Sequence, residues 1–85
     1  MSVRILYFAR LREDMGMAAE MFELPGETCD VNSLRAQLIA RGGAWATALG
    51  SGKAVRVSVN MDLARDDTPV KAGDEVAFFP PVTGG

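Results

Sequence analysis

The end of the sequence reads Val-Ala-Phe-Phe-Pro-Pro-Val-Thr-Gly-Gly over residues 76–85, a pattern that predicts a strand followed by a tail. Its first four residues are apolar, as is typical of a buried strand. Pro80 and Pro81 lack N–H donors and hold φ at about −65°, so they cannot continue a sheet ladder. They also favour extended backbone in the residues that precede them. We therefore expect a globular domain over residues 1–79 and a protruding tail over residues 80–85.

The tail ends in Val82, Thr83, Gly84 and Gly85. Because glycine has no Cβ, this end is expected to be a slim, flexible tip on a stiff proline stalk. Fully extended, the tail reaches roughly 20 Å, which is enough to enter another protein's active site. A disordered terminus is the alternative, but it has no need of two prolines. The terminal carboxylate of Gly85 is thus the leading candidate for a reacting group.

The composition argues against several classes of function. The chain has 85 residues, a net charge of −2, one cysteine and no histidine. This composition leaves no usual set of zinc ligands and no Ser-His-Asp or Cys-His catalysis, so we expect no metal site. No basic patch suggests nucleic acid, and no apolar run is long enough to span a membrane. With a single cysteine and no signal-peptide pattern, we expect a cytoplasmic protein.

The first half of the chain predicts two strands and a helix. Residues 3–8 alternate with period two, and residues 18–24 form a second strand candidate. Because only a tight stretch around residues 12–16 separates them, we expect a hairpin. Asp30 is a candidate N-cap for a helix that runs to about Arg41. The apolar positions at helical spacing, which should face the core, are Val31, Leu34 and Leu38.

The second half predicts a short helix and two strands. Gly42-Gly43 ends the long helix, residues 44–49 add a helical turn, and residues 55–60 alternate as a strand. A turn-rich connection over residues 62–71 leads to the final strand. This order predicts an α+β domain, with a mixed sheet of about four to five strands packed on one main helix. Terminal strands that flank a hairpin and a helix suggest a ubiquitin-like β-grasp, in which the first and last strands lie side by side.

Three motifs carry a resemblance to a known family. They are Phe-Ala-Arg-Leu-Arg-Glu over residues 8–13, Gly-Asp-Glu-Val-Ala-Phe-Phe over residues 73–79 and Pro-Pro-Val-Thr-Gly-Gly over residues 80–85. With their spacing, they resemble the small subunits of molybdopterin synthase, the sulfur carriers of molybdenum-cofactor biosynthesis. The resemblance covers essentially the whole chain.

The resemblance implies a carrier whose terminal carboxylate, on Gly85, becomes a thiocarboxylate. A ubiquitin-activating-like adenylyltransferase would join Gly85 to AMP using ATP, and a persulfide donor would replace the AMP with sulfur. The carrier would then dock on the large subunit, in a heterotetramer of two large and two small subunits, and pass sulfur to a cyclic pterin precursor. ATP and the persulfide act in trans, so no cofactor is expected to be bound permanently. The chain is expected not to be an enzyme on its own, with catalytic groups on the large subunit.

Phe8, Leu63 and Phe79 are the predicted docking residues. If Tyr7 and Phe78 point inward on adjacent terminal strands, then Phe8 and Phe79 point outward on one shared face. Exposed apolar clusters of this kind mark interfaces. The resemblance adds Leu63, because the corresponding positions of the family form the apolar contact with the large subunit.

Other interpretations remain open at this point. The carrier could serve another pathway, such as thiamine synthesis, or could modify proteins by forming isopeptide bonds on lysines. It could also be a β-grasp interaction module with no covalent chemistry. The Pro-Pro-Val-Thr stalk favours the molybdopterin branch. Cys29 is interpreted as a small, semi-buried residue, with a persulfide relay as the alternative.

Overall fold

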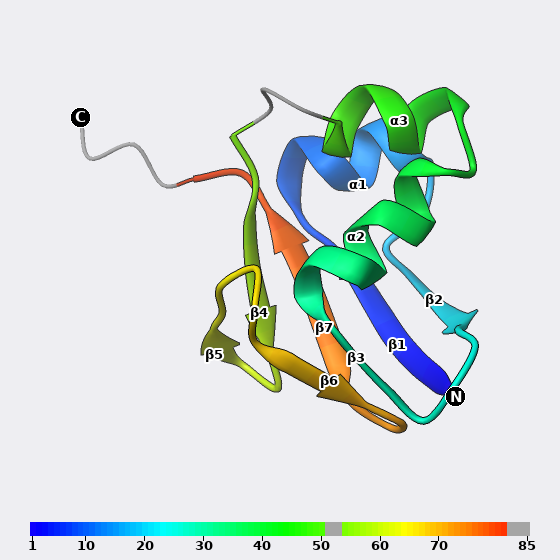
Figure 1. Ribbon diagram of the computed structural model, residues 1–85. Helices are drawn as coiled ribbons and strands as arrows, with labels where there is room; N and C mark the ends of the chain where they lie inside the picture. The colour runs from blue at the N-terminus through cyan, green and yellow to red at the C-terminus, as the bar shows by residue number, and fades with distance from the viewer. Residues whose placement is uncertain (51–53, 82–85) are drawn as a thin grey trace.

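Three helices and seven strands form within residues 1–50 and 54–81, the part of the chain that the computed structural model describes (Figure 1). In chain order they are β1 (Ser2–Tyr7), α1 (Ala9–Met15), β2 (Ala19–Glu23), β3 (Thr28–Asp30), α2 (Val31–Ile39), α3 (Gly43–Leu49), β4 (Arg56–Val59), β5 (Asp62–Leu63), β6 (Pro69–Lys71) and β7 (Glu75–Phe79). None of the helices in this described part is long and apolar enough to cross a membrane.

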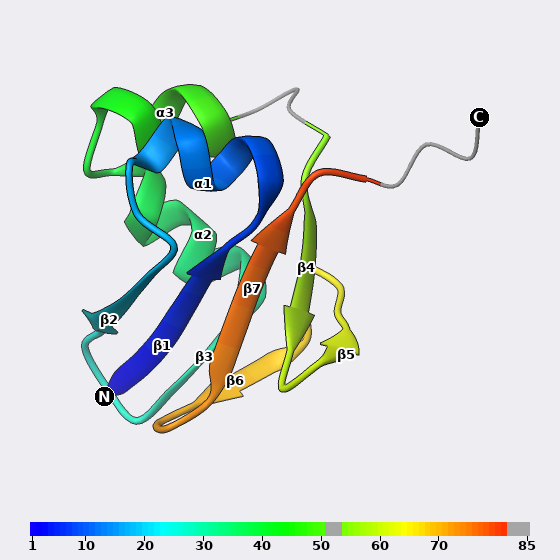
Figure 2. The same ribbon diagram turned by 180° about the vertical axis from the view of Figure 1, so that it is seen from behind.

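The large sheet confirms the predicted β-grasp. Its five strands follow the order β2-β1-β7-β4-β5, and β3 and β6 form a separate antiparallel pair. β1 and β7 are parallel neighbours, with Arg4 opposite Glu75 and Tyr7 opposite Phe78. The first and last strands therefore lie side by side in the middle of the sheet, as Figure 2 shows.

The predicted hairpin between the first two strands is partly wrong. β1 and β2 do pair antiparallel, but α1 connects them in place of a tight turn. Leu11 and Met15 lie four residues apart on α1 and are both buried, so the helix covers one end of the core. Gly16 ends the helix with a φ of 71°, a left-handed conformation that glycine adopts without strain. Two apolar residues one turn apart, Leu11 and Met15, are too few to predict a helix from the sequence.

The connection over residues 62–71 also contains two strands that the sequence prediction missed. β5 has two residues and β6 has three, too few for an alternating pattern to be visible. β5 pairs with β4 across a tight turn, and β6 pairs with β3. These short pairings give the connection a defined position beside the sheet.

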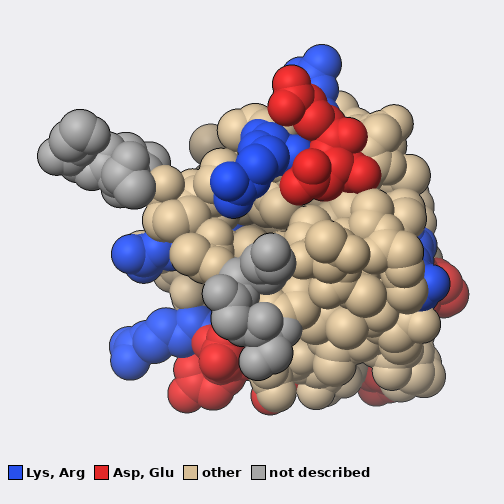
Figure 3. Space-filling model, turned by 90° about the horizontal axis from the view of Figure 1, so that it is seen from above, with Lys and Arg blue, Asp and Glu red and all other residues tan. Residues whose placement is uncertain are grey.

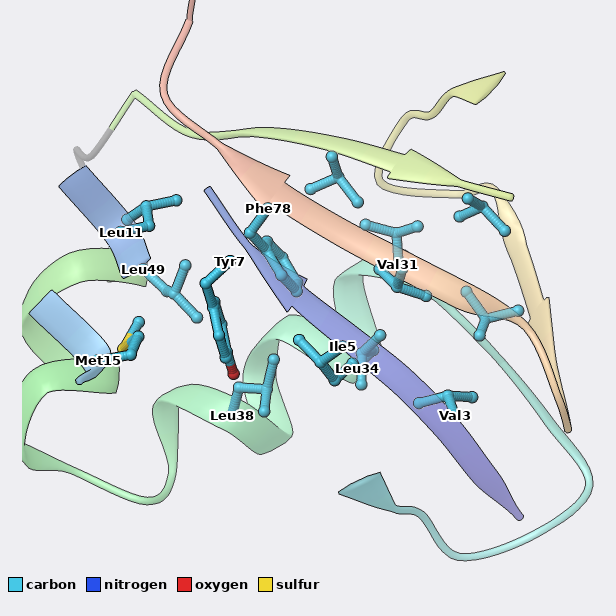
Figure 4. Packing of buried hydrophobic residues seen from close by; sticks show 14 of the residues in the cluster. Val3, Ile5, Tyr7, Leu11, Met15, Val31, Leu34, Leu38, Leu49 and Phe78 are labelled. Carbon is cyan, nitrogen blue, oxygen red and sulfur yellow. The ribbon is translucent and has the colours of Figure 1, made fainter. Parts of the chain in front are cut away.

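The helices and the inner face of the sheet enclose one core. α2 begins as predicted, because the Asp30 side chain accepts a hydrogen bond of 2.7 Å from the backbone N–H of Ser33. Figure 4 shows α2 side chains packed against β1 and β7, where the Tyr7 and Phe78 rings stack with centroids 6.3 Å apart. The fully buried members include Val3, Ile5, Leu34, Leu38, Leu49, Val70 and Val76.

A polar network closes the core beside α3. The Tyr7 hydroxyl donates to Glu20 at 2.7 Å and accepts from the indole N–H of Trp45 at 2.9 Å. Arg41 forms a 2.8 Å ion pair with Glu20, and its guanidinium lies 4.9 Å from the centre of the Trp45 ring. Burial, together with the hydrogen bond to Glu20, raises the pKa of the Tyr7 hydroxyl. Trp45, predicted as a core residue, is half-buried and packs against the core.

Replacing Tyr7 with phenylalanine is expected to destabilise the fold by about 1–3 kcal/mol. The variant keeps the ring but leaves the Trp45 N–H without its acceptor, and the Glu20 carboxylate loses the hydroxyl that donates to it. Urea denaturation at neutral pH measures the difference in the free energy of unfolding. A variant as stable as the parent chain would contradict a structural role for the hydroxyl group.

Candidate functional site

The helices cover one face of the large sheet and leave the opposite face uncovered (Figure 2). Apolar side chains lie on this uncovered face. Along β1 and β7 the core side chains alternate with Leu6, Ala77 and Phe79, which the strand pairing places on this outer side. Of these three, Ala77 is itself buried. The strand register places Ala77 between Leu6 and Ser58, and places Ser58 opposite Leu63. One row of side chains therefore crosses four strands of the sheet.

A shallow hollow of about 280 Å³ lies on this face. Two small side chains, Ala77 and Ser58, line it together with larger ones. The residues that line it are Leu6, Phe8, Ser58, Met61, Glu75, Ala77 and Phe79. Five of these seven residues are apolar, so the hollow is a mostly apolar concave surface of the kind that binds a partner group.

The members of this face differ in exposure. Phe8 is 48% exposed, Leu63 67% and Met61 88%, whereas Phe79 is half-buried. We call Leu6, Phe8, Met61, Leu63, Ala77 and Phe79 the apolar face. Contiguous exposed apolar surface on a small protein is typical of an interaction site.

The structure brings the three predicted docking residues onto one face. Phe8 and Phe79 line the same hollow, and Leu63 is joined to it through the register with Ser58. Phe78 has no exposed surface and lies in the core, so the two faces of β7 are as predicted. Whether these side chains dock a partner stays a prediction.

Sequence reasoning missed Leu6, Ala77 and Met61 as members of the apolar face. Leu6 carried a usable signal, because an apolar residue between Ile5 and Tyr7 must point away from the core. Ala77 carried the same signal between Val76 and Phe78. Met61 carried none, since it lies in a turn where no period applies.

The tail begins at the edge of the apolar face. β7 ends at Phe79, and Pro80 and Pro81 follow as half-buried residues outside any strand. The predicted reactive residue, Gly85, and its neighbours Val82, Thr83 and Gly84 lie outside the described residues. The boundary between domain and tail after residue 79 coincides with the end of β7 and otherwise stays a prediction.

A buried carboxylate ties the turn between β4 and β5 to the start of β7. The Asp74 side chain accepts hydrogen bonds from the Asn60 amide at 3.0 Å and from the Lys71 backbone N–H at 2.9 Å. The Asn60 side-chain oxygen in turn accepts a hydrogen bond from the Glu75 backbone N–H at 3.0 Å. Burial acts to raise the pKa of Asp74, but these two donors outweigh it and hold the pKa below its usual value.

Cys29 is half-buried in β3, beside the start of α2. Burial and the neighbouring Asp30 raise the pKa of its thiol, whereas a relay through a persulfide would be favoured by a lowered pKa. A thiol with a raised pKa is a poor nucleophile at neutral pH. The interpretation of Cys29 as a semi-buried structural residue is therefore favoured over a persulfide relay.

Charges of the two signs are mixed on the surface of the described residues seen from above. That view, onto the end that carries α1 and α3, shows acidic and basic groups side by side on a largely uncharged surface (Figure 3). Beside the apolar face, Arg4 and Glu75 lie 3.9 Å apart as an exposed ion pair. Among the described residues, no group of three or more His, Cys, Asp or Glu side chains is placed to hold a metal ion.

Residues 5–85 match the model of the ThiS family. The molybdopterin synthase sulfur carrier subunit of Escherichia coli (strain K12) is 43% identical over 83 residues, which cover 98% of this chain and 99% of that protein.

Two solved structures extend the comparison. SAMP1 from Haloferax volcanii has a TM-score of 0.80 and 28% identity, with all of both chains covered. A chain in the complex of subunits 1 and 2 of the molybdopterin-converting factor from Helicobacter pylori 26695 has a TM-score of 0.68 and 26% identity, again over all of both chains.

Replacing Asp74 with asparagine is expected to lower the free energy of unfolding by about 1–3 kcal/mol at neutral pH. The NH₂ group of the new side chain would face one of the two N–H donors, of Asn60 or Lys71, that Asp74 accepts from. Since folding lowers the pKa of Asp74, its contribution is present above the unfolded pKa of about 3.9 and is lost as the pH falls through the folded value. The difference between parent and variant should therefore shrink on acidification. Urea denaturation at several pH values measures it.

Asp67→Asn is the control, because Asp67 is exposed in the loop before β6 and should change stability by less than about 0.5 kcal/mol. A loss at Asp74 that stays the same at every pH would contradict a role for its charge.

Proposed function

The chain belongs to the ThiS family, and from this premise we propose that it is the sulfur carrier subunit of a molybdopterin synthase. The observation that carries the proposal is the match over 98% of the chain to a curated carrier of that name. The structure adds an apolar face that adjoins the start of the tail. A carrier needs both parts, one for recognition and one for delivery.

The reacting group we propose is the carboxylate of Gly85. A carboxylate resists substitution, because its carbonyl carbon is electron-rich and oxide is a poor leaving group. An adenylyltransferase partner would form the acyl–AMP bond from ATP and release pyrophosphate. A persulfide sulfur would then attack the activated carbonyl carbon and expel AMP. After a thiol partner reduces the remaining S–S bond, the terminal thiocarboxylate is a soft nucleophile, ionised at neutral pH.

The carrier itself supplies no acid or base for these steps in this scheme. Its sequence has no histidine, and the pKa of its one cysteine is raised. Proton transfer and substrate binding would therefore fall to the partners, and for sulfur transfer to the large subunit. The solved complex of subunits 1 and 2 from Helicobacter pylori supports a large-subunit partner, since its small chain has this fold. We further propose two large and two small subunits, acting in the cytoplasm.

Docking in this proposal uses Phe8, Leu63 and Phe79. Burying three such side chains contributes about 1.5–3 kcal/mol each. Association costs about 4–15 kcal/mol, so these side chains alone give weak binding. The tail inserted in the partner, from Pro80 to Gly85, would provide the rest. A moderate affinity suits a carrier that must leave the activating enzyme before it reaches the synthase.

A second candidate function is protein modification through the same activated tail. The similarity to SAMP1, which other solved structures describe as a small archaeal modifier protein, favours it. The two functions share the activation step and differ in the acceptor, a pterin precursor or a lysine amine. Isopeptide conjugates of this chain in cells that contain the activating enzyme would distinguish the second from the first.

Incubation with a matching adenylyltransferase, ATP and a persulfide donor should exchange one oxygen for sulfur on Gly85. Intact-mass spectrometry measures the exchange, and fragmentation should localise it to the last residue. The variant that lacks Gly84 and Gly85 is the control, and it should gain no sulfur while melting at nearly the same temperature. An unchanged mass with a demonstrably active adenylyltransferase would contradict the proposed chemistry.

Replacing Phe79 with aspartate should weaken binding to the large subunit by about 2–4 kcal/mol, or roughly thirty- to a thousand-fold. The new charge would have to be buried in the hollow beside Phe8. Titration calorimetry measures the affinity, and circular dichroism checks the fold. Ala36→Asp on the exposed side of α2 is the matched control, because it adds the same charge on the helical side of the molecule. Equal affinities for the two variants would place the interface elsewhere.

A further inference from the structure

Met61 is the most exposed large apolar residue in the described part of the chain. Its side chain is 88% exposed, compared with 67% for Leu63, 65% for Met21 and 48% for Phe8. An exposed methionine buries almost no surface in the folded monomer, so it contributes little to folding through the hydrophobic effect. Packing therefore gives no reason for an apolar residue at this position.

The backbone at Met61 is also unfavourable for methionine. Asn60 and Met61 are the two central residues of the β4–β5 turn, with φ values of 50° and 73°. A two-residue hairpin turn with positive φ at both positions prefers glycine at the second. Asn60 suits its position, because asparagine tolerates the left-handed region. Met61 does not, so this turn has a strained residue where glycine would serve folding better.

The surrounding contacts hold the turn in this shape. Asn60 exchanges backbone and side-chain hydrogen bonds with Glu75, and its amide donates to the buried Asp74. The turn is thereby joined to the start of β7, and Met61 lines the same hollow as Phe8 and Phe79. Backbone strain that the surroundings maintain at an exposed residue is often found at functional sites.

We propose that Met61 is a further docking residue, which contacts an apolar surface of the large subunit and extends the interface along β7 away from the tail. The inference rests on the proposed function, because it names the same partner. Met61 lies in the turn beside the start of β7, and Phe79 ends this strand, about 13 Å away along its five residues. A partner that closes over the whole hollow must therefore cover Met61. The unbranched thioether adapts to the shape of the surface that it meets.

Two substitutions separate docking from folding. Met61→Gly creates the favoured Asn-Gly turn, so the melting temperature should stay the same or rise, while affinity for the large subunit should fall about tenfold. Met61→Leu keeps an apolar side chain on the same backbone and should retain affinity within about threefold. Met21→Ala is the matched control on β2, because Met21 is an exposed methionine that does not line the hollow.

Titration calorimetry with the purified large subunit measures all three variants beside Phe79→Asp. Unchanged affinity of Met61→Gly, with Phe79→Asp weakened, would overturn the role of Met61 and leave the proposed function standing. A loss for Met21→Ala equal to that for Met61→Gly would overturn it as well, because the effect would not be specific to the hollow. If the parent chain does not bind the large subunit, the proposed function fails, and this inference fails with it.

Discussion

The parallel pairing of β1 with β7 is the contact on which the rest of the structure depends. It places the two terminal strands at the centre of the sheet, with β2 on one side and β4 on the other. The inward side chains of this pair, such as Tyr7 and Phe78, form the middle of the core. The outward ones, such as Leu6 and Ala77, form the middle of the apolar face. One pairing thus positions both the core and the surface on which the proposed function relies.

In the proposed function, the same pairing positions the start of the tail for group transfer. β7 is held on both edges by hydrogen-bonded neighbours, so Phe79 and the start of the tail have a fixed position relative to the apolar face. In the proposed function, the docking surface and the point where the tail begins therefore belong to the same strand. Chemistry in the proposed function comes from partners, and the carrier contributes geometry.

Long periodic segments were predictable from the sequence, and short ones were not. The alternation in β1 and the cap at Asp30 identified their elements, because each reflects a strong local preference. α1, β5 and β6 are held by tertiary contacts and have too few residues for a period. The outward positions of Phe8 and Phe79 followed from strand alternation. Met61 did not, because its exposure and its positive φ arise from a turn that only the folded chain defines.

The central position of β7 also determines when the sheet can form during synthesis of the chain. β1 is made first, yet its parallel partner lies near position 75, so the sheet cannot form around it until most of the chain has left the ribosome. Until then, the apolar residues of β1 have only β2 and the helices to cover them. Apolar surface exposed in this way makes an incompletely folded chain prone to aggregation. A product that stops before β7 would lack the middle of its sheet and be open to proteolysis.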